Sequence, residues 1–147
     1  MEKVKYQKLW ACMHDNPHHH QMDDLNTWYE HMKKIYDFWP IAYYPFGMVP
    51  TETGFGTEDL LPEDKINADW EIVRQLVKKA NKEGYPMFMG YEWQGSGLDG
   101  DHNVFFLNND QNMKHPIRYE ELYEEFKDAP AIAIPHHLAY HLGDRGK

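Results

Sequence analysis

Histidine and carboxylate side chains gather in five short segments of this chain, each beside an apolar run that predicts a β-strand. The segments are residues 13–16, 18–20, 91–92, 101–103 and 135–137, and they hold most of the 10 histidines. Imidazole nitrogens combined with carboxylate oxygens suit Zn²⁺, Mn²⁺ or Fe²⁺, whereas Ca²⁺ prefers oxygen alone. The pattern therefore predicts a divalent metal centre assembled from distant parts of the sequence.

Apolar periodicity predicts the elements that would position these segments. Apolar runs predict strands at residues 6–12, 41–44, 87–91, 104–107 and 131–134. Helical spacing predicts a helix starting near Asp23 or Asp24, a second from Asn67 to Gly84 and a third around residues 119–126, with a long loop over residues 47–64. The order βα-βα-ββα-β is typical of an α/β fold with a largely parallel sheet, which is the fold class that we expect.

Strand geometry would bring the candidate ligands together. In a parallel sheet linked by helices, the C-terminal strand ends lie at one edge, and His14, Glu92 and His136-His137 each follow a predicted strand. His102 precedes its strand, but the connection from Glu92 is too short for a crossover helix. The short connection predicts an antiparallel hairpin, which would return His102 to the same edge. His136 and His137 project in opposite directions from an extended segment, so one of them is expected to support the site rather than bind metal.

Other residues have two interpretations. Residues 18–20 either form a solvated loop or contribute one histidine to the metal site. Their spacing from His14 does not indicate which of the three would be the ligand. Glu92 follows an apolar strand, and a buried carboxylate needs a cation or hydrogen-bond donors, which favours a metal-site role. His31, His115 and His141 are expected at the surface.

These motifs resemble the PHP (polymerase and histidinol phosphatase) domain, and especially its branch of predicted metal-dependent hydrolases. Members of that family open with a strand running into His-x-His, continue with a Gly-x-Glu strand and a histidine-to-valine segment, and end a later strand in Pro-His. The corresponding segments here are His14-Asp15-Asn16, Gly90-Tyr91-Glu92, His102-Asn103-Val104 and Pro135-His136-His137. The motifs occur in the family's order along nearly the whole chain.

The resemblance implies a PHP-type (β/α) barrel that holds Zn, Mn or Fe ions and hydrolyses a phosphorylated small molecule. Its metal ligands would be His14, Asp23, Glu92, His102 and His136 or His137. Asp15 or Asp24 would complete the site or act as the catalytic base. A bridging hydroxide between two ions would be the nucleophile.

The chain also departs from the family pattern. Asn16 replaces the second histidine of His-x-His, Pro45-Phe46 stands where the family has Asp-His, and the later Asp-x-His motif is absent. We therefore expect residues 1–147 to form one incomplete or distorted barrel domain, either the N-terminal part of a longer domain or a reduced relative. The competing hypothesis is a non-catalytic module that binds a metal or a carbohydrate.

Composition limits the partners. The net charge of −9 argues against a nucleic-acid partner, because phosphate binding needs a concentrated surface of Lys and Arg and none appears in the sequence. No apolar stretch reaches the length of a membrane span and no signal peptide is recognisable, so we expect no membrane partner and a cytoplasmic location. Cys12 is the single cysteine and forms no intrachain disulfide. An open sheet edge in an incomplete barrel predicts self-association.

Overall fold

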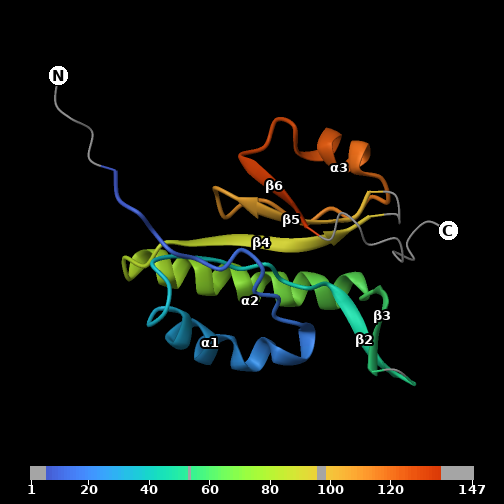
Figure 1. Ribbon diagram of the computed structural model, residues 1–147, viewed down its shortest axis with the longest axis horizontal. Helices are drawn as coiled ribbons and strands as arrows, with labels where there is room; N and C mark the ends of the chain where they lie inside the picture. Colours follow the sequence, from blue (N-terminus) through green and yellow to red (C-terminus); the bar gives the residue numbers. More distant parts are fainter. Residues whose placement is uncertain (1–5, 53, 96–98, 137–147) are drawn as a thin grey trace.

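The computed structural model describes residues 6–52, 54–95 and 99–136. Its centre is a curled sheet of four strands in the order β1-β4-β5-β6, and a separate hairpin pairs β2 with β3 (Figure 1). In chain order, the described elements are the 3-10 helix η1 (His19–Asp24), α1 (Leu25–Met32), β1 (Trp39–Pro40), β2 (Phe46–Thr51), β3 (Gly54–Leu60), α2 (Glu63–Lys82), β4 (Met87–Gln94), β5 (Asp101–Phe106), α3 (Tyr119–Phe126) and β6 (Ala131–His136).

The sheet is mostly antiparallel, so the expected largely parallel sheet of a PHP-type (β/α) barrel is wrong. β1 pairs with β4 in parallel, whereas β5 is antiparallel both to β4 and to β6. A helix between two strands is typical of a parallel crossover. Here α3 and its flanking loops instead return the chain to the end at which β5 finished, since Phe106 pairs with Ala131. The fold is a small mixed α/β half-barrel.

The hairpin predicted between Glu92 and His102 is confirmed, because β4 and β5 pair antiparallel along their length. β6 runs in the direction of β4, and His136 pairs with Asp101 at the start of β5. The backbones of Glu92, His102 and His136 therefore lie at one edge of the sheet. This is the shared edge that the strand geometry predicted.

Two other predicted elements are wrong. Residues 6–12 form no strand, and the segment is joined instead to the turn after α1, where the amide of Trp10 donates to Asp37 Oδ2 over 2.8 Å. Residues 47–64 contain most of the β2–β3 hairpin rather than a loop. Glycine and proline interrupt the alternation of this stretch, so its sequence carries little strand signal.

The three predicted helices are confirmed, although α2 starts earlier than expected. It begins at Glu63 rather than near Asn67, because Pro62 precedes it with a φ of −52° and acidic residues fill its first turn. Gly84, with a φ of 85°, follows the end of α2 in the left-handed region that favours glycine. Within the described residues, no helix has the length and apolar character that crossing a bilayer requires.

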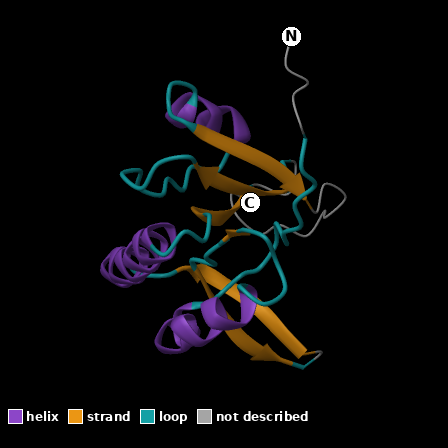
Figure 2. Cartoon of the chain, turned by 90° about the vertical axis from the view of Figure 1, so that its left-hand side faces the viewer, coloured by secondary structure: helices purple, strands orange, loops and turns teal. Residues whose placement is uncertain are grey.

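Helices α2 and α3 pack on one face of the four-stranded sheet, which we call the helix-covered face (Figure 2). The ring of Trp70 in α2 meets Tyr91 and Phe106 edge to face, with centroids 6.2 and 6.1 Å apart. Phe106 also contacts Phe126 of α3 at 5.2 Å. Burial of these aromatic side chains fixes which face of each strand points away from the helices.

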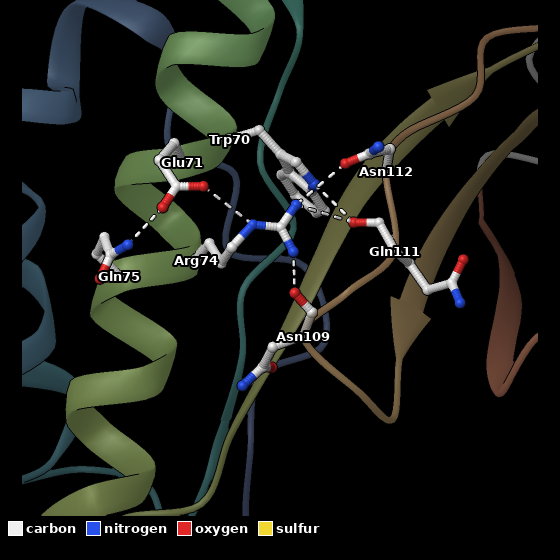
Figure 3. Close-up of polar contacts among 7 residues, drawn as sticks. All are labelled: Trp70, Glu71, Arg74, Gln75, Asn109, Gln111 and Asn112. Atoms are coloured by element: carbon white, nitrogen blue, oxygen red, sulfur yellow. Dashed lines mark hydrogen bonds and ion pairs between the residues drawn. The ribbon is translucent and has the colours of Figure 1, made fainter.

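Arg74 of α2 holds the segment that leads from β5 to α3 (Figure 3). Its guanidinium donates to the backbone carbonyl oxygens of Asn109 and Gln111 and, over 3.1 Å, to Asn112 Oδ1. Trp70 Nε1 donates to the same carbonyl of Gln111 over 3.0 Å. One helix turn therefore satisfies the backbone acceptors of an irregular segment that has no sheet partner at these positions.

Candidate functional site

The face of the sheet opposite the helices carries polar side chains where β4 ends. In an antiparallel ladder, directly opposed residues project to the same face, and neighbours along a strand alternate. Glu92 pairs with Asn103 and Gln94 pairs with Asp101, so these four side chains share the face away from the helices. Glu92 and Asn103 are each 3% exposed and Asp101 is 6% exposed.

Residues 14–18 extend this polar surface from the far side of β1. The segment runs parallel to the stretch that follows β1, with bridges formed by Asp15 and His18. Alternation turns His14, Asn16 and His18 toward the side of Glu92, whereas Asp15 projects to the helix-covered side. We call the set the polar face, and it consists of His14, Asn16, His18, Tyr44, Glu92, Gln94, Asp101 and Asn103.

The Glu92 carboxylate is the centre of the polar face. His14 Nε2 lies 3.2 Å from Glu92 Oε2, and Asn16 Nδ2 donates to the same oxygen. Gln94 Nε2 lies 3.5 Å from Oε1. The amide of Asn103 donates to the carbonyl of Met13 over 2.7 Å, which ties the N-terminal segment across the sheet. The buried carboxylate therefore lies among donors from the distant N-terminal segment and from its own strand.

Tyr44 forms one side of the polar face. Its hydroxyl accepts a hydrogen bond from Gln94 Nε2 over 2.6 Å, and its ring centroid lies 4.5 Å from that of His18. The His20 ring stacks on His18 at 5.7 Å. Burial, and secondly the neighbouring His20, lower the pKa of His18, and the opposing effect of Glu92 is smaller. A neutral imidazole is therefore favoured at this side.

Close packing against β5 explains why residue 90 of the Gly-Tyr-Glu segment is a glycine. It pairs with Phe105 across the hairpin, and a Cβ atom at position 90 would overlap the Phe105 ring and approach the carbonyl oxygen of Val104. The aromatic ring therefore covers the glycine on the same face as Glu92. Glycine here lets β4 and β5 stay in the register that buries the carboxylate.

The structure brings together His14 and Glu92, two of the predicted ligands, but separates His102 from them. His102 pairs with Trp93, so its side chain projects to the helix-covered face. Its ring stacks on Tyr119 of α3 with centroids 4.6 Å apart. The hairpin thus returned His102 to the expected edge, but on the opposite face of the sheet, because its position differs by one residue from that of Asn103.

The three predicted acids do not join the polar face. Asp23 and Asp24 are exposed at the end of η1, before α1. Asp15 is half-buried on the helix-covered side. Burial raises the pKa of Asp15, while Cys12 and His14 lower it by smaller amounts.

The predicted ligands at the end of β6 are only partly described. The backbone of His136 lies opposite Asp101, at the edge that carries Glu92. His137 lies outside the described residues. The assignment of either histidine as a ligand stays a prediction.

Only a few groups on the polar face could hold a divalent ion. Three buried polar atoms on it have no hydrogen-bond partner among the described residues, namely Asn16 Oδ1, Asn103 Oδ1 and His18 Nδ1. Within residues 6–52, 54–95 and 99–136, no three His, Cys, Asp or Glu side chains form a metal-binding group. His14 and Glu92 would thus supply the strong ligands, with amide oxygens and water completing the shell. These ligands would suit Mn²⁺ better than Zn²⁺, because a structural zinc ion takes four protein ligands.

Sequence reasoning missed Gln94, Asp101, Asn103 and Tyr44 as members of this face. The signal was available in the alternation of the strands, since residues 92 and 94 share a face in any extended segment. For β5, however, the choice between His102 and its two neighbours depends on the hairpin register. The eight residues between Glu92 and Asp101 leave that register open.

Comparison with known proteins assigns no family to this geometry, and the PHP resemblance rests on the sequence motifs alone. The chain matches no family model, no curated protein and no solved structure.

Proposed function

We propose that the polar face binds a divalent metal ion and hydrolyses a phosphoester bond in a small-molecule substrate. The observation that carries the proposal is the buried Glu92 carboxylate, 3% exposed, in contact with His14 and Asn16. Asp101, also buried, shares that face. Two buried carboxylates on one face form a charge arrangement that a divalent cation matches.

The residues of this face have separable tasks in that proposal. Glu92 and His14 hold the ion, and the Asn16 amide orients the carboxylate. Asn103 keeps the N-terminal segment closed over the sheet through its bond to Met13. A bound ion supplies Lewis-acid polarisation of a phosphoryl oxygen and an activated water. Because the described ligands are few, we expect weak binding and slow turnover.

Titration calorimetry with Mn²⁺ and hydrolysis of an aryl phosphate test the proposal. Wild-type protein should bind Mn²⁺ and hydrolyse the aryl phosphate to a phenol and inorganic phosphate. Glu92→Gln should weaken binding by more than about 100-fold, because loss of even an outer partner typically costs about 10–100-fold. The control is Glu120→Gln, at an exposed position of α3 (its side chain is 76% exposed), which should leave both measurements unchanged. Absence of Mn²⁺ binding by the wild type would contradict the proposal.

A second candidate is a non-catalytic module. The observation that favours it is the lack of a three-ligand His, Cys, Asp or Glu group in the described part of the chain. Mn²⁺ binding without aryl phosphate turnover, at any Mn²⁺ concentration that saturates the protein, would support this candidate over the hydrolase.

A further inference from the structure

A third buried carboxylate lies on the opposite side of the sheet and belongs to a three-residue chain of hydrogen bonds. Asp69 of α2 is 2% exposed. Its Oδ2 atom accepts a hydrogen bond from the hydroxyl of Tyr43 over 2.6 Å. The same oxygen lies 2.8 Å from Nδ1 of His19 in η1, whose side chain is 42% exposed. We call these residues the Asp69 anchor.

The chemistry of the anchor determines where His19 carries its proton. Burial, and secondly Asp69, raise the pKa of Tyr43 far above its usual range, so Tyr43 keeps its proton and donates it. A carboxylate that accepts from His19 requires a hydrogen on Nδ1, because an ionised carboxylate has no hydrogen to give. The anchor therefore selects the Nδ1–H form of the imidazole and leaves Nε2 directed elsewhere.

The anchor is linked through the chain to the polar face. Tyr43 and Tyr44 are neighbours that project to opposite sides of the sheet. Tyr43 reaches Asp69, whereas Tyr44 contacts the His18 ring and the amide of Gln94. His18 immediately precedes His19, so the turn that carries both histidines is held on one side by Asp69 and on the other by Tyr44.

We infer that Asp69 is a positioning residue for the polar face, which it serves by fixing the turn of residues 18–20 through His19. The inference rests on the proposed function, because it assigns Asp69 a part in forming that metal site. A carboxylate that orients a histidine by its second ring nitrogen is a recurring support of metal centres. In this chain the support acts through the neighbouring residue, because His18, rather than His19, projects to the side of Glu92. The buried His18 Nδ1 atom has no hydrogen-bond partner among the described residues and would add a nitrogen ligand to those of His14 and Glu92.

A matched pair of substitutions at His19 separates positioning from direct metal binding. The amide of asparagine places an N–H near the position of Nδ1 but has nothing equivalent to Nε2. His19→Asn should therefore keep the bond to Asp69 and keep the wild-type Mn²⁺ affinity within about twofold. His19→Ala and Asp69→Asn should each weaken Mn²⁺ binding by about 10–100-fold. Asp64→Asn, at an exposed position of the first turn of α2, is the control and should change nothing.

Imidazole ¹⁵N and ¹H resonances provide the readout that does not depend on metal. Wild-type His19 should show the Nδ1–H form, and the His18 ring protons should show the shift caused by the Tyr44 ring at 4.5 Å. In His19→Ala the His18 shift should move toward its value in an unfolded peptide, and in His19→Asn it should stay. If Asp69→Asn does not fold, the two His19 variants at the exposed end of the anchor carry the test.

The outcomes distinguish this inference from the proposed function. Equal loss of Mn²⁺ affinity in His19→Asn and His19→Ala would overturn positioning in favour of a direct His19 ligand. An Nε2–H form in the wild type, or an unchanged His18 shift in His19→Ala, would also overturn it, whether or not Mn²⁺ binds. If the wild type binds no Mn²⁺ but the His18 shift responds as expected, the proposed function fails while the anchor still positions the turn.

Discussion

Glu92 and His102 lie at the same edge of the sheet but on opposite faces. Glu92 is paired with Asn103, and His102 is paired with Trp93, so a single residue of register separates the two side chains. Glu92 contacts His14 and Asn16, whereas His102 stacks on Tyr119 beneath α3. A polar residue next to a predicted ligand can therefore be the one that faces the site.

The first prediction concerns His102. Replacing it with alanine removes the Tyr119 stacking and leaves a cavity under α3, which should lower the free energy of unfolding by about 2–4 kcal/mol. Mn²⁺ affinity should stay at the wild-type value, because the side chain is absent from the polar face. Urea denaturation and calorimetry measure the two effects. Loss of Mn²⁺ binding by a folded His102→Ala protein would show that His102 reaches the metal.

The second prediction concerns Gly90. Gly90→Ala should lower the free energy of unfolding by about 1–3 kcal/mol, because the new methyl group overlaps the Phe105 ring. Replacing the ring by a smaller side chain in the double variant Gly90→Ala/Phe105→Leu should recover part of the lost free energy of unfolding. A double-mutant cycle by urea denaturation gives the coupling between the two positions. Purely additive changes would mean that the ring does not limit the space at position 90.

The third prediction concerns the Arg74 network. Arg74→Lys keeps the charge but cannot reach all three acceptors of the 109–112 segment, so it should lower the free energy of unfolding by about 1.5–3 kcal/mol. The matched control, Glu71→Gln, removes the ion pair with Arg74 at a position that is 55% exposed and keeps an amide oxygen that can accept from Gln75, so it should cost less than about 1 kcal/mol. Hydrogen exchange should increase in residues 107–117 of Arg74→Lys. Equal costs in the two variants would assign the effect to the ion pair.

The fourth prediction concerns alkaline pH. Burial, and secondly Tyr29, raise the pKa of Tyr85 from 10.0 to about 12. Between these values the unfolded chain loses the phenol proton and the folded chain keeps it. The contribution of Tyr85 is therefore fully present below pH 10 and is lost as the pH rises through 12. Urea denaturation at pH 8 to 12 should show this decline, and Tyr85→Phe should make it shallower. An identical slope in Tyr85→Phe would assign the decline to other groups.

Local signals in the sequence were sufficient for the helices and for the β4–β5 hairpin. The apolar stripe of α2 and Gly84 at its end predicted that helix, because both act within a few residues. The short connection after Glu92 ruled out a crossover helix, and with it a parallel pair. The sequence also predicted His14 and Glu92 as metal ligands, and the structure places these two side chains in contact.

The sequence by itself determined the three helices, the β4–β5 hairpin and the pairing of His14 with Glu92 as candidate ligands. Only the tertiary structure decided the direction of β6 and the face to which each side chain projects, because both depend on pairings between distant segments. The direction of β6 follows from where the connection after Phe106 returns. Asn103, rather than His102, faces Glu92 because of the β4–β5 register. The burial of Trp93 and Tyr91 under the helices enforces that register. Alternation has a period of two, so a shift of one residue would have exchanged every side chain between the two faces.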